Sequence, residues 1–201
     1  SLDPQVAELI GISLSYAKNI SFYIPVGHKN IKSLNKDFVV KKLKPILEDP
    51  SIKKVGQNIK YDFIILKKYG VELNSVEDTM LLSYTLDAGN NRHNMDTLSE
   101  LHLNHKTISY KDLVGSGKKQ LKFSEVDIDK ATEYAAEDAD VTLRLYEILS
   151  ERVSDEKLSQ IYEAFEKPMI KILSKLETYG IKVDDNYLKE LSKKFEKRLE
   201  K

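Results

Sequence analysis

Short strand-like runs alternate with helix-like segments, and this alternation limits the possible folds of the 201-residue chain more than any other feature. Apolar and aromatic runs over residues 6–14 and 21–26 are typical of two strands joined by a polar turn. Helical spacing of apolar residues follows over 36–48, then a short strand over 52–56 and a second helix over about 58–69. Strands that alternate with helices indicate an α/β domain with a mixed sheet.

The rest of the chain is predicted to be mostly helical. Asp78 is placed to cap one helix, residues 95–103 form another, and Asp127 or Asp129 begins a long third one. Residues 154–201 differ in composition, because they are rich in Lys and Glu and are broken once, at 179–184. We therefore predict a domain boundary near residue 154.

The composition excludes several classes of protein. The 32 basic residues balance 32 acidic ones, which argues against a uniform basic field for coating duplex nucleic acid but leaves a local basic patch open. The absence of Cys excludes a disulfide scaffold, a Cys-based zinc site and a Cys nucleophile. No apolar run reaches the ~18 residues of a membrane span, and the first residues lack the pattern of a signal peptide.

Two acidic residues fall on apolar helical stripes. Asp138 shares a stripe with Tyr134 and Val141, and Asp62 shares one with Ile65. A lone ionised carboxylate costs several kcal/mol to bury, so each of these acids needs a cation, a metal ion or hydrogen-bond donors. An ion pair with Lys or a capping hydrogen bond is enough to explain a single acid on a buried stripe. The presence of two such acids favours a metal site. Without Cys or a suitable His pair, the ion would be Mg²⁺ or Mn²⁺.

Two of the segments around these acids resemble a known family. Residues 56–62 (Gly-Gln-Asn-Ile-Lys-Tyr-Asp) look like the second motif, and 134–140 like the third motif (Tyr-x-x-x-Asp), of the proofreading 3′–5′ exonuclease domain of bacterial DNA polymerase I. Residues 78–81, 92–98 and 105–108 are similar to the same family in order and spacing. The resemblance covers essentially the whole chain and points to the four-acid exonucleases that use Tyr in the third motif.

This resemblance implies a fold and an activity. The fold is a ribonuclease H-like mixed sheet flanked by helices in residues 1–153, and residues 154–201 begin the polymerase domain of the same natural chain. The implied reaction is two-metal hydrolysis of the 3′-terminal phosphodiester of single-stranded or frayed DNA, which releases nucleoside 5′-monophosphates. The implied partner is a DNA 3′ end, and the implied location is the bacterial cytoplasm, away from membranes.

The family also assigns roles to residues. Asp138 would bind the metal that activates the attacking water, Tyr134 would orient that water, and Asp62 would help to hold the second metal. The resemblance also implies contacts with DNA. Leu2 would be an apolar wedge against the terminal bases, and the ring of Tyr110 would stack on a base. Five further side chains would lie near phosphate or sugar: Gln57, Asn58, Lys60, Arg92 and His93. Glu137 and Asp140 lie off the stripe and are expected to be solvated.

One family motif is absent from the sequence. The first motif, Asp-x-Glu on the central strand, normally precedes a segment like the first three residues, and no Asp-x-Glu occurs in the chain. We therefore expect the 201 residues by themselves to be nearly inactive. A catalytically silent scaffold for the polymerase is the alternative, which the presence of Asp62, Tyr134 and Asp138 disfavours. A free-standing RNA-trimming exonuclease is a third reading, which the polymerase-like tail disfavours.

Overall fold

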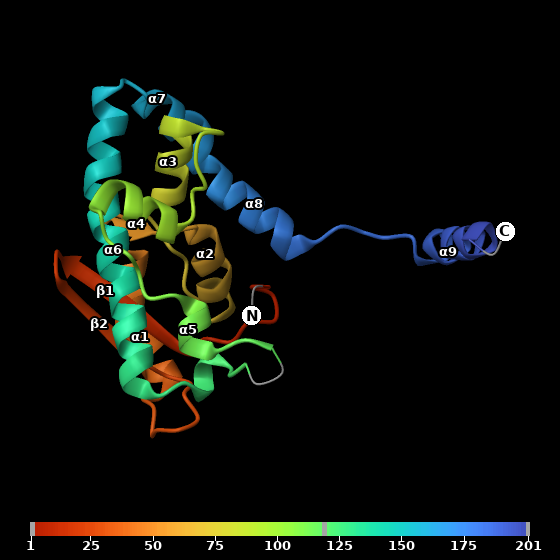
Figure 1. Ribbon diagram of the computed structural model, residues 1–201, viewed down its shortest axis with the longest axis horizontal. Coiled ribbons are helices and arrows are strands. Elements are labelled where there is room, and N and C mark those ends of the chain that lie inside the picture. The colour runs from red at the N-terminus through yellow and green to blue at the C-terminus, as the bar shows by residue number, and fades with distance from the viewer. Residues whose placement is uncertain (1–2, 118–119, 200–201) are drawn as a thin grey trace.

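The computed structural model describes residues 3–117 and 120–199 (Figure 1). Its elements are β1 (Gly11–Ala17), β2 (Ile20–Pro25), α1 (Lys36–Glu48), β3 (Lys54–Gly56), α2 (Ile59–Lys68), β4 (Val76–Asp78), α3 (Thr79–Asp87), α4 (Met95–Leu103), α5 (Tyr110–Val114), η2 (Phe123–Glu125), α6 (Ile128–Asp155), α7 (Ser159–Ile161), η3 (Tyr162–Glu166), α8 (Lys167–Tyr179) and α9 (Asp185–Leu199). This order confirms the α/β class and the predicted sequence of strands and helices.

The strands of the described residues form two pairs. β1 and β2 are an antiparallel hairpin with Ile12 opposite Ile24, whereas β3 and β4 run parallel with Val55 opposite Glu77. Both pairing directions occur, as a mixed sheet requires, but among the described residues the two pairs are separate two-stranded sheets with no backbone hydrogen bonds between them. The long helix α6 packs against β1, β2 and β3, so it covers both pairs (Figure 1).

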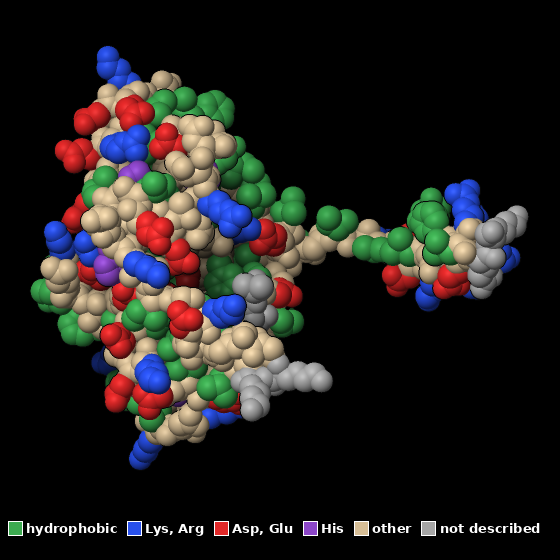
Figure 2. Space-filling view, in the orientation of Figure 1, with side chains coloured by type: hydrophobic (Ala, Val, Ile, Leu, Met, Phe, Trp, Pro, Cys, Tyr) green, Lys and Arg blue, Asp and Glu red, His purple; other side chains and the backbone are tan. Residues whose placement is uncertain are grey.

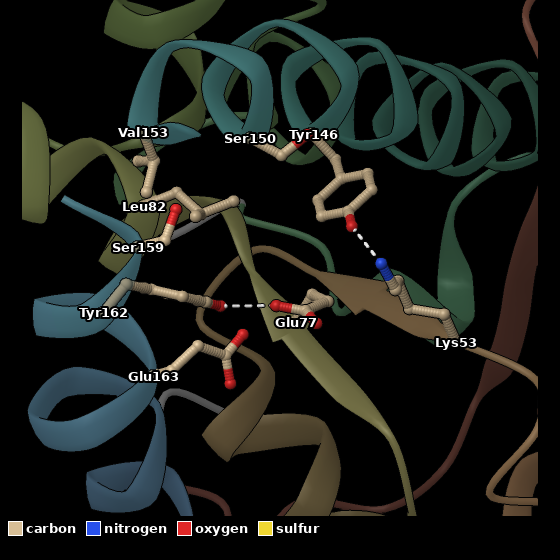
Figure 3. A pocket seen from close by; sticks show the side chains of 9 residues that line it. All are labelled: Lys53, Glu77, Leu82, Tyr146, Ser150, Val153, Ser159, Tyr162 and Glu163. Atoms are coloured by element: carbon tan, nitrogen blue, oxygen red, sulfur yellow. Dashed lines mark hydrogen bonds between the residues drawn. The ribbon is translucent and has the colours of Figure 1, made fainter. Parts of the chain in front are cut away.

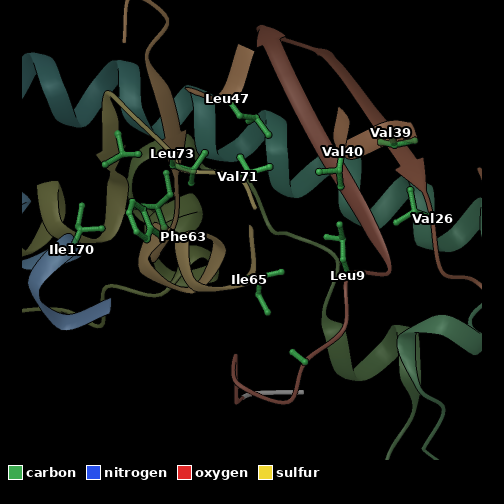
Figure 4. Packing of buried hydrophobic residues seen from close by; sticks show 13 residues of the cluster. Leu9, Val26, Val39, Val40, Leu47, Phe63, Ile65, Val71, Leu73 and Ile170 are labelled. Atoms are coloured by element: carbon green, nitrogen blue, oxygen red, sulfur yellow. The ribbon is translucent and has the colours of Figure 1, made fainter. Parts of the chain in front are cut away.

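Apolar side chains from distant segments form the core. One cluster lies between the hairpin, α1 and α2 and includes Leu9, Val40 and Phe63 (Figure 4). A second cluster joins α3, α4 and α6 around Leu145, which is fully buried. Ile170 of α8 belongs to the first cluster, so part of the segment beyond residue 154 packs against the preceding domain.

The C-terminal helix is separate from this body. α8 ends at Tyr179 and α9 begins at Asp185, which confirms the predicted break at 179–184. No residue of α9 is buried, and the helix extends away from the other elements, as the ribbon (Figure 1) and the space-filling view (Figure 2) both show. Among the described residues, no helix is both long and apolar enough to cross a bilayer.

The side chain of Asp78 connects two helices. Its Oδ1 accepts hydrogen bonds from the backbone N–H groups of Asn58 (3.0 Å) and Met80 (2.9 Å). Its Oδ2 accepts one from the N–H group of Ile59 (2.9 Å). Asp78 therefore caps α3, as the sequence predicts, and also caps α2, whose N-cap residue Asn58 is left-handed (φ 56°) and makes no side-chain cap.

A buried polar network lies next to this capping residue (Figure 3). The Tyr162 hydroxyl accepts a hydrogen bond from the Asp78 N–H group (3.1 Å) and donates one to Glu77 (2.9 Å). Lys167 forms an ion pair with Glu77 at 2.8 Å. Glu77 and Tyr162 border a small cavity of about 110 Å³, which is also lined by Lys53 and Tyr146, and Lys53 donates to the Tyr146 hydroxyl (2.6 Å). The network attaches η3 and α8 to β4.

A buried histidine gives the fold a pH dependence. His28 is 6% exposed, its Nε2 lies 2.8 Å from the Tyr23 hydroxyl, and burial lowers the pKa of His28. The folded state thus disfavours the charged imidazole, so this contribution to stability is complete above about pH 6.5 and is lost as the pH falls through the lowered pKa. We expect acidification from about pH 7 to about pH 5 to lower the unfolding temperature more in the original chain than in His28→Gln. Equal pH slopes in calorimetry would contradict this expectation.

Candidate functional site

The Tyr134–Asp138 pair lies one helical turn apart near the start of α6. Asp127 caps this helix by accepting from the N–H groups of Asp129 and Lys130, which sets where the helix begins. Val141, further along the predicted stripe, is fully buried, whereas Asp138 and Tyr134 are half-buried. Asp138 therefore lies at the edge of the core, with its side chain reachable from solvent.

The electrostatics of Asp138 suit a cation. Burial raises the pKa of Asp138 to about 7, and the carboxylates of Glu137 and Asp96 add to the shift, whereas a hydrogen bond with Tyr134 opposes it. Burial and the adjacent Asp138 also raise the pKa of Tyr134, so this phenol stays protonated at neutral pH. No Lys or Arg ion pair neutralises Asp138 among the described residues. A metal ion there would offset the cost of the charged carboxylate.

Asp62 departs from the prediction that it faces the core. Its side chain is exposed, and α2 instead buries Ile59, Phe63, Ile64 and Ile65. These four residues cover a wide arc of the helix, so Asp62 lies on the remaining open strip. Protein on the other sides still desolvates the carboxyl group and, with a smaller contribution from Asp78, raises the pKa of Asp62. The open position is compatible with binding a hydrated metal ion.

Tyr110 lies near a tyrosine beside each acidic position, Tyr134 on α6 and Tyr61 on α2. Its ring centroid lies 5.9 Å from that of Tyr134, and its hydroxyl influences the pKa of both Tyr134 and Tyr61. Tyr61 precedes Asp62 on α2, so α2 and α6 both face the region around Tyr110. Within residues 3–117 and 120–199, no three His, Asp or Glu side chains are grouped closely enough to hold a metal ion. Asp62 and Asp138, which form no ion pair in the part of the chain that the structure describes, nevertheless fit hard divalent ions better than any other metal.

Glu137 is not solvated, contrary to the prediction. Its carboxylate bonds to His105 Nε2 (2.8 Å) and accepts from the N–H group of Ile108 (2.7 Å). Thr107 in the same segment donates to Asp96 at 2.7 Å. Glu137 thus fastens the segment before Tyr110 to α6. The sequence prediction failed because these partners lie about 30 residues away in sequence.

Replacement of Glu137 by Ala should loosen this segment. The Ile108 N–H group loses a charged acceptor, worth about 1.5–3 kcal/mol, so its exchange with solvent deuterium should accelerate about 10- to 100-fold. Glu133→Ala, an exposed position one turn earlier on α6, is the matched control and should leave this amide unchanged. Unchanged exchange at residue 108 in Glu137→Ala would contradict the assigned role.

Asp140 is also buried rather than solvated. It is 9% exposed, and its carboxylate accepts a hydrogen bond from the N–H group of Asn19 and one from Arg144 (3.4 Å). Asn19 has a positive φ of 64° in the turn between β1 and β2. Asp140 therefore attaches the hairpin turn to α6. The sequence prediction missed this structural role because Asn19 is distant from Asp140 in sequence.

Two of the residues predicted to contact DNA, Gln57 and His93, form hydrogen bonds within the protein. Gln57 donates to the backbone carbonyl of His93 (2.7 Å) and accepts from the Thr79 hydroxyl. The His93 ring bonds to the Ser83 hydroxyl (2.9 Å) and packs edge-on against Tyr84. These contacts fix the loop before α2 to α3 and to the loop before α4. Their proposed contact with DNA stays a prediction.

The other residues predicted to contact DNA lie in different elements and differ in how exposed they are. Lys60 forms an ion pair with Glu177 of α8, and Arg92 is exposed in the loop before α4. Asn58 is half-buried at the start of α2, and the Tyr110 ring is 47% exposed. Leu2 lies outside the described residues. Among the predicted contacts in the described residues, Tyr110 has a ring contact with Tyr134.

Comparison with known proteins identifies the family. A family model described as 3′–5′ exonuclease matches residues 1–154. The chain belongs to the 3′–5′ exonuclease family. DNA polymerase I of Rhizobium leguminosarum is 45% identical over 96% of this chain, and that of Pseudomonas aeruginosa is 40% identical over 94%. These matches confirm the resemblance seen in the motifs. The chain spans only about a fifth of the length of these relatives (21% of each).

Solved structures support the fold. NrnC of Brucella melitensis matches with a TM-score of 0.68 at 23% identity, covering 90% of this chain and 81% of that protein. The POL domain of Pol1 from M. smegmatis, in complex with DNA primer-template and dNTP, matches with a TM-score of 0.72 at 21% identity, covering 94% of this chain and 29% of that one. NrnC has also been solved with bound Mg²⁺. The architecture thus agrees with the ribonuclease H-like fold that the sequence implies.

Proposed function

We propose that this 3′–5′ exonuclease domain removes nucleotides from the 3′ end of single-stranded or frayed DNA as the proofreading part of a DNA polymerase I. The observation that carries the proposal is the Tyr134–Asp138 pair, a desolvated carboxylate that has no cationic partner within the described residues and lies beside a protonated phenol. The second acid, Asp62, lies on a neighbouring helix that faces the same aromatic side chain, Tyr110. The length and identity of the relatives support a polymerase that continues beyond this domain, in the cytoplasm of a bacterium.

Asp62 and Asp138 would hold the divalent ions. Bound Mg²⁺ or Mn²⁺ supplies activation of water and stabilisation of the leaving oxygen. The Tyr134 hydroxyl keeps its proton at neutral pH and can hydrogen-bond a water molecule beside Asp138. The exposed ring of Tyr110 offers a stacking surface for a terminal base, which binds any sequence because every base has a flat face.

Two further acids complete this proposed site. The resemblance places them in an Asp-x-Glu motif on a central strand, and that motif is absent from the sequence. The structure supports a strand at this place, because β1 and β3 both lie against α6 and are not bonded to each other among the described residues. A strand between them would join the two pairs into one mixed sheet. We therefore propose that the 201 residues alone hydrolyse DNA slowly or not at all.

A nucleotide-release assay tests the function. The 201-residue chain and the chain with any residues that its gene encodes before Ser1 are each incubated with 5′-labelled single-stranded DNA. With Mg²⁺ or Mn²⁺, the longer chain should shorten the DNA from its 3′ end one nucleotide at a time, and a chelator should stop it. If the longer chain carries Asp-x-Glu and releases no nucleotide, the silent scaffold is the correct function. If activity persists in chelator, the proposed metal site is wrong.

A further inference from the structure

Four aromatic rings of the described residues surround Phe123. Its ring centroid lies 6.4 Å from Tyr110, 6.1 Å from Tyr134, 6.3 Å from Tyr23 and 5.6 Å from His28. The Tyr110 ring is nearly parallel to Phe123 (17°), whereas the Tyr134 ring is steeply inclined to it (61°). Such offset-stacked and edge-on arrangements are the favourable ones for aromatic pairs. Phe123 thus contacts both tyrosines of the proposed site.

The backbone around Phe123 is held by the loop after β2. The N–H group of Lys29 donates to the carbonyl of Ser124 (2.8 Å), and the Asn30 side chain donates to the carbonyl of Glu125 (2.8 Å). Lys29 also forms an ion pair with Glu125 at 2.7 Å. Val126, directly after η2, is 2% exposed. Phe123 also packs on the apolar cluster of Val114 and Val126, so it is held both by the loop after β2 and by the end of α5.

The two tyrosines need such a support. Tyr110 begins α5, a helix of five residues, and half of its ring surface is exposed. Tyr134 lies on α6, so the two side chains come from different elements of the fold. The two tyrosine rings contact each other at 5.9 Å, and Phe123 contacts both, so its ring supports the spacing between the base-stacking surface and the hydroxyl beside Asp138.

We propose that Phe123 is a positioning residue that sets the spacing between Tyr110 and Tyr134, and so places the 3′-terminal base relative to Asp138. This inference rests on the proposed function, since it assigns the two tyrosines to base and water. The inference makes two requirements of a variant that lacks the Phe123 ring. The first is weaker DNA binding, because Tyr110 is displaced. The second is slower turnover, because Tyr134 is displaced as well.

Binding of a thymidine tetranucleotide in the presence of a chelator tests the first requirement without hydrolysis. Phe123→Leu should weaken binding about tenfold, because the stacking ring loses its support. Phe123→Trp keeps a flat ring and should bind within about twofold of the original chain. Phe38→Leu is the matched control, since Phe38 is 57% exposed on α1, and its binding should not change.

The same substitutions provide a spectroscopic test. The chain has no Trp, so Phe123→Trp introduces the sole indole, and the tetranucleotide should change its fluorescence. Tyr110→Ala added to Phe123→Trp should abolish that change. This fluorescence measurement tests the inference even if Phe123→Leu does not fold. No change in the indole fluorescence of Phe123→Trp on addition of the tetranucleotide would overturn the inference.

Kinetics of the nucleotide-releasing chain test the second requirement. Phe123→Leu should raise KM and lower kcat, whereas Tyr110→Ala should mainly raise KM. A loss of folded protein alone would lower kcat and leave KM unchanged, and that result would overturn the positioning role. Equal binding by the original chain and a folded Phe123→Leu overturns only this inference. Failure of the original chain to bind the tetranucleotide overturns the proposed function and the inference with it.

Discussion

Asp138→Asn is expected to lower the rate of 3′ nucleotide release about a thousandfold or more. The amide keeps the shape of the side chain but removes the negative charge that would hold a metal ion, and metal-ion catalysis supplies several kcal/mol of transition-state stabilisation. Asp129→Asn, at an exposed position in the first turn of α6, is the matched control and should retain the original rate. The assay follows 5′-labelled single-stranded DNA with the chain that carries any residues encoded before Ser1.

The stability of the same variant separates a metal role from a folding role. Burial disfavours the charged form of Asp138, so a neutral amide should fold at least as well in the absence of metal. We expect the unfolding temperature of Asp138→Asn, measured in chelator, to equal or exceed that of the original chain. Full activity, or a loss of activity accompanied by a large drop in unfolding temperature, would contradict the proposed role.

Local spacing explains why much of the fold was predictable. Val141, Leu145 and Leu149 follow one helical stripe and are all buried, because the period of a helix is fixed by its backbone. The Asp78 cap of α3 depends on residues two positions away and was predicted for the same reason. Its second cap, on Ile59 of α2, depends on the parallel pairing of β3 and β4, which brings together residues 19 positions apart.

The candidate site was only partly predictable, because its supports come from distant segments. Motif resemblance selects Asp62, Tyr134 and Asp138, but spacing wrongly assigned Asp62 to a buried face. The partners of Glu137 could not be read from its position on α6, since they depend on how the segment before Tyr110 folds. The same holds for Phe123, whose neighbours come from four separate parts of the chain.

Asp78→Ala is expected to destabilise the domain by about 3–5 kcal/mol. The side chain is 1% exposed, and its removal leaves the N–H groups of Asn58, Ile59 and Met80 without their acceptor, each at a cost of about 1–3 kcal/mol if it stays buried. Urea unfolding measures the change as a lower midpoint at constant slope. Asp37→Ala, an exposed acid in the first turn of α1, is the control and should cost less than about 1 kcal/mol.

The Asn variant distinguishes the capping bonds from general packing. Asp78→Asn keeps an oxygen at Oδ1, which serves Asn58 and Met80, and replaces Oδ2, the acceptor for Ile59, with a donor. Its cost should therefore lie between those of the original chain and Asp78→Ala, at about 1–3 kcal/mol. Since Ile59 is in the first turn of α2 with Asp62, the folded Asn variant should also release nucleotides more slowly than the original chain. Equal stability of Asp78→Asn and Asp78→Ala would show that the Oδ1 bonds contribute little, and the double cap would then be wrong.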